Sequence, residues 1–159
     1  MPGVPALLQP VAHALVDADE DVQKFVPSLS SQQIAARPGG AAPIGYHVTH
    51  AIGSLDRLFT YARGEALNEK QLAALAAEKA LDPASFTAKQ LAADFAAAVQ
   101  RAHAQLRRTP ESELLETRLV GRAKVPSNVL GLLVHAAEHT ARHVGQIVTT
   151  AKIVRGALP

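Results

Sequence analysis

The sequence contains no cysteine and no tryptophan, and only 4% of its residues are aromatic. The lack of cysteine excludes disulfides, thiolate metal ligands, iron–sulfur clusters and a cysteine nucleophile. Because aromatic residues are scarce, the 48% of hydrophobic residues are mainly leucine, valine, isoleucine and alanine. A core built from these residues suits closely packed helices better than it suits a β-sandwich.

A large excess of charge and long apolar runs are also lacking. The formal net charge is only +2, without a dense cluster of lysine or arginine, so we expect no nucleic-acid partner. No apolar run approaches the roughly 18 residues that a bilayer-spanning helix needs, so we expect no membrane partner either. Residues 1–20 contain no lysine or arginine and therefore lack the basic region of a secretory signal. These features together predict a cytoplasmic protein.

The length of 159 residues favours one domain, covering 1–159, with a single hydrophobic core. Four stretches have apolar residues at every third or fourth position, which is the pattern of an amphipathic helix. They cover about 5–25, 43–63, 87–108 and 126–154. Helix–strand alternation and hairpin signals are absent, which counts against α/β and all-β folds. The sequence therefore predicts an all-α four-helix bundle.

The segments between these stretches are harder to interpret. Residues 27–40 are too rich in proline and glycine for a regular element. Residues 68–81 are rich in alanine and have the composition of a short helix, but they show no clear buried face. Residues 119–125 have no helical period and are compatible with extended backbone.

Five of the seven histidines fall in two short segments, one in the second predicted helix and one in the fourth. They are His47, His50, His135, His139 and His143. Positions four apart on a helix differ by about 40° around its axis, so His139 and His143 point the same way, one turn apart. This is the spacing with which two imidazoles on a helix hold one cation. The sequence therefore predicts a metal-binding pair on the fourth helix.

The stripe that contains this pair is flanked by Leu132, Ala136 and Ile147, so we expect it to face the interior. Two adjacent imidazoles placed there without a ligand would be costly to desolvate. A third histidine from another inward face would complete a site with open coordination positions. The residues alone leave His47 and His50 as alternatives for that position. If the histidines are incidental, the bundle mediates only protein association.

Two motifs resemble those of the DinB-like (damage-inducible) superfamily of four-helix-bundle metalloenzymes: PIGYHVTH at 43–50 and HAAEHTARHVGQ at 135–146. The order and lengths of the four predicted helices are similar as well. The resemblance implies an up-down-down-up bundle, commonly a homodimer, that binds a divalent ion such as zinc or nickel through three histidines. By position, the ligands it implies are His50, His139 and His143. The superfamily's usual basic residue after the last of these is Val144 here.

Other polar residues near these motifs are expected to lie outside the ligand set. We expect His47, His135 and Gln146 to orient a ligand or to contact a substrate. Glu138 and Arg142 have the i, i+4 spacing of an ion pair on the helix surface. The sequence identifies no catalytic residue and no residue that binds an organic cofactor.

Three neutral imidazoles would leave a bound ion its full positive charge, so the ion can acidify water or activate an incoming thiolate. Bundles that resemble this one include transferases and isomerases that use low-molecular-weight thiols. We therefore predict a metal-dependent enzyme with a small-molecule substrate. It would be either an S-transferase-like enzyme that uses such a thiol or a hydrolase that uses metal-bound hydroxide. The alternative is a metal-binding stress-response protein without turnover.

Association with a second copy is also expected. Apolar residues beyond one stripe, such as Phe59, Leu72 and Leu75, can leave an exposed patch for another protomer. The resemblance points the same way. Both arguments predict a homodimer.

Overall fold

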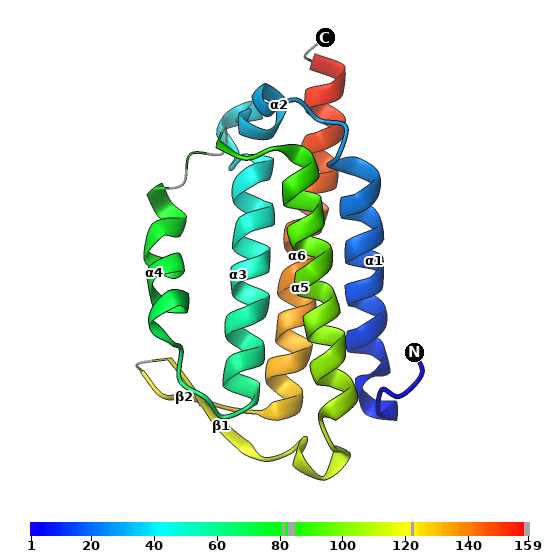
Figure 1. Ribbon diagram of the computed structural model, residues 1–159, viewed down its shortest axis with the longest axis vertical. Helices are drawn as coiled ribbons and strands as arrows, with labels where there is room; N and C mark the ends of the chain where they lie inside the picture. The colour runs from blue at the N-terminus through cyan, green and yellow to red at the C-terminus, as the bar shows by residue number, and fades with distance from the viewer. Residues whose placement is uncertain (81, 83–84, 122, 158–159) are drawn as a thin grey trace.

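Four long helices form the body of the protein in the computed structural model, which describes residues 1–80, 82, 85–121 and 123–157. They are α1 (Gln9–Phe25), α3 (Ile44–Ala62), α5 (Ala88–Arg108) and α6 (Val129–Ala157). Along the chain they run up, down, down and up (Figure 1). The predicted all-α, up-down-down-up bundle is confirmed.

Each long helix packs against two neighbours, because α6 lies against α3 and α1 while α5 lies against the same two helices. Their facing stripes supply one continuous apolar core, in which the fully buried side chains include Leu15, Val22, Ile44, Phe95, Leu106, Leu133 and Ile147. Because the chain has few large aromatic rings, alanine and β-branched residues let the helices approach closely. Within the described residues, no helix has both the length and the hydropathy needed to cross a bilayer.

The order and direction of the long helices explain the position of helix α4 (Glu69–Ala77). Since α3 and α5 run in the same direction, the chain must return along the bundle between them, and α4 carries it back (Figure 1). A capping box between Asn68 and Gln71 starts the helix. All nine residues of α4 are described and none of them is buried, so it lies outside the core. The short helix expected within 68–81 is present, but it adds no buried residue to the apolar core, which the four long helices form.

Short elements fill the remaining connections. They are the five-residue helix α2 (Ser31–Ala35), the hairpin strands β1 (Thr117–Val120) and β2 (Val125–Asn128), and the 3₁₀ turns η1 (Ala6–Leu8), η2 (Pro38–Gly40), η3 (Glu78–Ala80) and η5 (Glu111–Glu113). The expectation that 27–40 holds no regular element is wrong, because a capping box at Ser30 and Gln33 nucleates α2.

The expectation that hairpin signals are absent is also wrong. Strands β1 and β2 pair antiparallel, with Thr117 opposite Asn128. Positive φ angles at Gly121 (65°) and Lys124 (49°) accommodate the turn. Because Asn128 is still paired in the sheet, α6 begins at Val129 rather than near residue 126.

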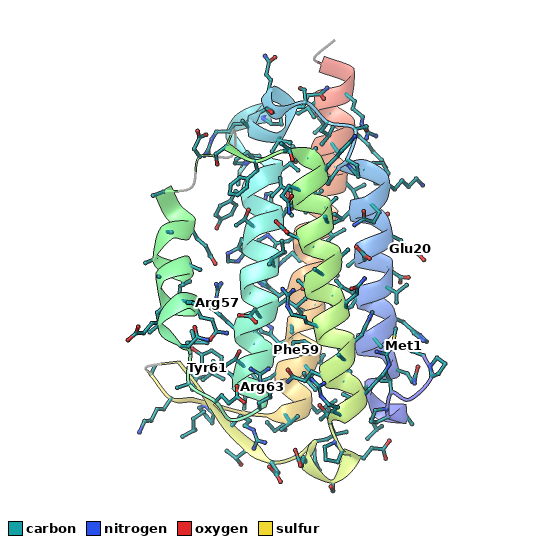
Figure 2. The ribbon with its side chains drawn as sticks, viewed as in Figure 1. Met1, Glu20, Arg57, Phe59, Tyr61 and Arg63 are labelled. Carbon is teal, nitrogen blue, oxygen red and sulfur yellow. The ribbon has the colours of Figure 1, made fainter. Side chains whose placement is uncertain are left out.

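The apolar residues expected at the surface divide into two groups. Leu72 and Leu75 on α4 are 43% and 41% exposed, as a surface patch requires. Phe59 on α3 is only 3% exposed, so its assignment to that patch is wrong. Its side chain faces α5 and lines a groove of about 450 Å³ between the two helices, next to Arg63 (Figure 2).

Candidate metal centre

Three histidines from two helices meet where α3 packs against α6. His50 extends from α3, while His139 and His143 extend from successive turns of α6. One ring nitrogen from each lies within 4.8 Å of the other two. Nε2 of His50 and Nε2 of His139 are 3.1 Å apart. The residues expected to form a triad therefore lie together.

The packing of α6 explains this arrangement. Leu132, Ala136 and Ile147 flank the histidine stripe and are all buried, as expected. This apolar face turns the stripe toward α3, while the three rings themselves are only half-buried. The site is therefore held by the core but remains open to solvent on one side.

Glu78, at the start of η3, contacts the outer side of His50. Its Oε2 atom is 2.8 Å from Nδ1 of His50, and its Oε1 atom accepts a hydrogen bond of 2.5 Å from Nη1 of Arg57. Arg57 extends from α3 into the space between α3 and α4 (Figure 2). Tyr46 stacks on the His50 ring, with the ring centroids 5.5 Å apart. Polar and aromatic contacts therefore fix the orientation of His50.

The two α6 histidines also have polar partners. Nη2 of Arg142 lies 2.6 Å from Nδ1 of His139. Nδ1 of His143 lies 2.9 Å from Nδ1 of His47, a buried residue on α3. His47 therefore lies behind the triad and contacts one of its members, as expected for a residue that orients a ligand.

The prediction that Glu138 and Arg142 form an ion pair is wrong. The Arg142 guanidinium contacts His139 at i−3, and Oε2 of Glu138 lies 3.8 Å from Nδ1 of His135. Both the i, i+3 and i, i+4 spacings place side chains on one helix face, so spacing alone did not decide between the partners.

Proton positions on these rings follow from what their partners can donate or accept. A guanidinium only donates, so Nδ1 of His139 accepts and the ring's own proton lies on Nε2. A carboxylate only accepts, so the proton of neutral His50 lies on Nδ1, next to Glu78. Nε2 of His50 is then free to accept from Nε2 of His139, which agrees with their separation of 3.1 Å. The partners at both ends of this chain thus assign the same tautomer to His50.

The surroundings favour neutral imidazoles. Burial lowers the pKa of His143 to about 4, and the nearby charges of His50 and His139 act in the same direction. Burial also lowers the pKa of His139, followed by the effects of His50 and Arg142. The pKa of His47 is lowered by burial and then by His50. Since a ring must be neutral to bind a metal ion, these rings are available as ligands at neutral pH.

Other residues expected near the site have weaker links to it. His135 is exposed, although its ring centroid lies 5.8 Å from that of His139. Gln146 is exposed on α6 and makes no hydrogen bond within the described part of the chain. Whether either residue contacts a substrate stays a prediction.

Sequence reasoning missed Glu78 and Arg57. Glu78 belongs to a segment without a clear apolar period, and its contact with His50 spans 28 positions in the chain. One signal was present: Glu78 comes at the end of an alanine-rich run in which it is the only carboxylate after Glu69. That signal does not indicate which surface the carboxylate reaches.

The donor set fits a divalent transition-metal ion. Zinc binds imidazole nitrogen at about 2.0–2.1 Å, which places two tetrahedral ligands roughly 3.3 Å apart. The observed 3.1 Å between the Nε2 atoms of His50 and His139 is close to that separation. Zinc, nickel and copper all accept imidazole ligands, so the donors fit the class of ion without selecting one.

The lowered histidine pKa values predict how the stability of the metal-free protein depends on pH. Unfolded histidine has a pKa near 6.5, so between about 6.5 and 4 the unfolded state binds protons that the folded state does not. We therefore expect the free energy of unfolding to be greatest above pH 6.5 and to fall as the pH drops toward 4. Below pH 4 the histidines should no longer contribute to the change of this free energy with pH. Urea titrations at several pH values, in the presence of a chelator, measure this free energy.

The matched control for this prediction is His143→Asn, which removes the ring whose pKa is lowest. Carboxylates also titrate in the lower part of the range and affect both proteins. The variant should therefore show a shallower fall between pH 6.5 and 4 than the parent. Equal slopes would contradict the assignment of a depressed pKa to His143.

Comparison with known proteins places the chain in a family. The family model of the DinB superfamily matches residues 14–147, which include all three histidines. A crystal structure of a conserved protein from Enterococcus faecalis is similar in fold, with a TM-score of 0.70 and 21% sequence identity. The match covers 94% of this chain and 97% of that one. No curated protein matches the chain. With most of its length matched by the family model, the chain belongs to the DinB superfamily.

Proposed function

We propose that the protein binds one divalent ion, zinc or nickel, through His50, His139 and His143. The observation that carries this proposal is the convergence of three half-buried imidazole nitrogens within 4.8 Å. The lowered pKa values of His139 and His143 support it, because protons compete weakly for those rings at neutral pH. Three protein ligands would leave coordination positions for a small molecule.

We further propose that the protein is an enzyme of the S-transferase type that uses a low-molecular-weight thiol. When bound, the ion supplies Lewis acidity that lowers the pKa of a thiol or of water. The charges around the triad favour an anion such as a thiolate. The lowered pKa values of His139 and His143 favour their neutral forms, Arg57 offsets the charge of Glu78, and the guanidinium of Arg142 adds a positive charge beside His139.

The residues of the chain have separate tasks in this proposal. Glu78 and Tyr46 hold the ring of His50, and His47 holds the ring of His143. Arg142 contacts the open edge of the site, where it can attract an anionic substrate. Each task is binding or orientation, and none of these residues is assigned a proton transfer.

A second function, metal binding without turnover in a stress response, has one observation in its favour. Glu78 is the buried carboxylate in contact with the triad, and both of its oxygens already have partners. It is therefore not free to act as a general base. A hydrolase that uses metal-bound hydroxide would need a base from elsewhere.

We also propose a homodimer located in the cytoplasm. The exposed side chains of Leu72 and Leu75 on α4 support association through this helix. Changing both to glutamate should convert a dimer into a monomer, as measured by light scattering at micromolar concentration. Leu115→Glu, at a side chain that is 76% exposed in another part of the chain, is the control and should leave the mass unchanged. A monomeric parent would contradict the proposal.

Metal binding is tested by calorimetric titration of zinc and nickel at pH 7.5. Replacing His50, His139 or His143 with alanine removes a ligand, so each change should weaken binding by more than about 100-fold and abolish the rise in melting temperature. His47→Ala should weaken binding less, by about 10–100-fold, because this ring contacts a ligand rather than the ion.

His135→Ala should also weaken binding less than the loss of a ligand does, and His13→Ala, which removes an exposed histidine from α1, is the control. It should bind zinc as the parent does. If His47→Ala abolishes binding while His50→Ala retains it, the third ligand is His47. If all the variants bind like the parent, these histidines do not form a metal site.

The thiol is tested with protein loaded with cobalt(II), whose spectrum reports on its ligands. Adding glutathione should produce the near-ultraviolet charge-transfer band of a cobalt–thiolate bond. Oxidised glutathione, which has the same carboxylates but no thiol, is the control and should not. A spectrum that glutathione leaves unchanged would contradict the use of this thiol and favour the function without turnover.

A further inference from the structure

The most deeply buried acidic side chain that contacts the triad belongs to Glu78, whose side chain is only 9% exposed. Burying a carboxylate is costly unless its oxygens are paired. Here each oxygen has its own partner, because Oε2 lies 2.8 Å from Nδ1 of His50 and Oε1 accepts from Nη1 of Arg57. A glutamate at the end of an exposed helix is usually exposed to solvent, so the burial of Glu78 calls for a structural explanation.

The backbone of α3 is shaped to accept the pair. A Cβ atom placed on Gly53 would lie 2.8 Å from Nη1 of Arg57 and 2.8 Å from Oε1 of Glu78. Both distances are shorter than any ordinary carbon contact. The ion pair therefore passes directly over the Cα atom of Gly53, and a side chain at this position would displace it.

Polar contacts attach α4 and η3 to α3 at both ends. At the start of α4, Nε2 of Gln71 donates to Oδ2 of Asp56 (2.6 Å) and to Oγ1 of Thr60 (2.8 Å). At the other end, Glu78 contacts His50 and Arg57. Since no residue of the fully described α4 is buried, these contacts hold the segment more than apolar packing does.

We propose that Glu78 is the positioning residue of His50, and that the segment 68–80 carries it, so that metal binding at His50 and the seating of α4 on α3 are coupled. The inference rests on the proposed metal site. Glu78 accepts the Nδ1 proton of His50 and so directs the lone pair of Nε2 toward His139 and His143. A carboxylate in this position fixes the tautomer and the ring orientation of a metal-binding histidine.

The coupling follows from the same hydrogen bond. An ion at Nε2 withdraws electron density from the ring, so the Nδ1 proton becomes a stronger donor to Glu78. Metal binding then stabilises the contact that anchors the end of α4. By thermodynamic reciprocity, a seated α4 raises the affinity for the ion by the same factor.

The first test needs no metal. Nitrogen-15 spectra of the histidine rings in the metal-free protein report which nitrogen is protonated. The parent should show His50 protonated at Nδ1. Glu78→Ala and Glu78→Gln are measured alone and together with Arg142→Ala, because Arg142 assigns the same tautomer to His50 through His139. With Arg142→Ala, Glu78→Ala should show a mixture of tautomers, whereas Glu78→Gln keeps an acceptor oxygen and should retain the parent tautomer. Glu69→Gln, an exposed glutamate at the start of the same helix, is the matched control. A His50 that keeps its tautomer when both Glu78 and Arg142 are replaced by alanine overturns the positioning role.

The second test adds zinc to the same proteins. Affinity should fall about 10–100-fold in Glu78→Ala and less in Glu78→Gln. Gly53→Ala should also weaken binding, because it displaces the ends of two flexible side chains without removing a hydrogen-bonding group. In the parent, zinc should slow amide hydrogen exchange across 69–77, and in Glu78→Ala it should not.

The outcomes separate the two proposals. A parent that does not bind zinc overturns the metal site, while the tautomer of His50 still decides the role of Glu78. A parent that binds zinc, with unchanged affinity in Glu78→Ala, overturns the inference alone. Exchange across 69–77 that zinc does not alter in the parent overturns the coupling of α4 to the site.

Discussion

The packing of α3 against α6 is the interaction on which the site depends, because neither helix supplies three histidines to one point. Buried apolar residues on α6, such as Ala136 and Ile147, turn its histidine stripe toward α3. The opposing face of α3 then brings His50 to within 3.1 Å of His139. A shift of one turn between the helices, about 5.4 Å, would separate these rings entirely. The core thus determines the geometry of the site.

Polar groups around the triad offset the free-energy cost of removing the imidazole rings from water. One nitrogen of each ring has a protein partner: Glu78 for His50, Arg142 for His139 and His47 for His143. These partners orient the rings, and burial keeps His139 and His143 neutral by lowering their pKa values. The contact with Glu78 also favours a cation at Nε2 of His50. His139 would have to move its proton from Nε2 to Nδ1, beside Arg142, to bind a cation through Nε2.

The long helices and the family could be predicted because they depend on local patterns. Apolar residues at helical spacing give α1, α3, α5 and α6, and the two histidine motifs carry the resemblance to the DinB superfamily. The residues alone left His47 and His50 as alternatives, and the resemblance implied His50. In the structure the ring of His50 meets His139, whereas the ring of His47 contacts His143.

The surroundings of the triad could not be predicted because they depend on contacts distant in sequence. Glu78 reaches His50 through a helix that buries none of its own nine residues, so no apolar period indicates where that helix lies. Arg142 had two partners at equally suitable spacing, and in the structure it contacts His139. The hairpin of β1 and β2 was missed for a similar reason, since each strand has only four residues and Pro126 lies within one of them.

The central claim is that His50, His139 and His143 together bind one divalent ion. The most direct measurement is an anomalous difference map at the zinc absorption edge, from crystals of the protein grown with zinc. We expect one strong peak per chain, at about 2.0–2.1 Å from a ring nitrogen of each of the three histidines. A map without a peak there, or a peak bound by His47 or by Glu78 in place of His50, would contradict it.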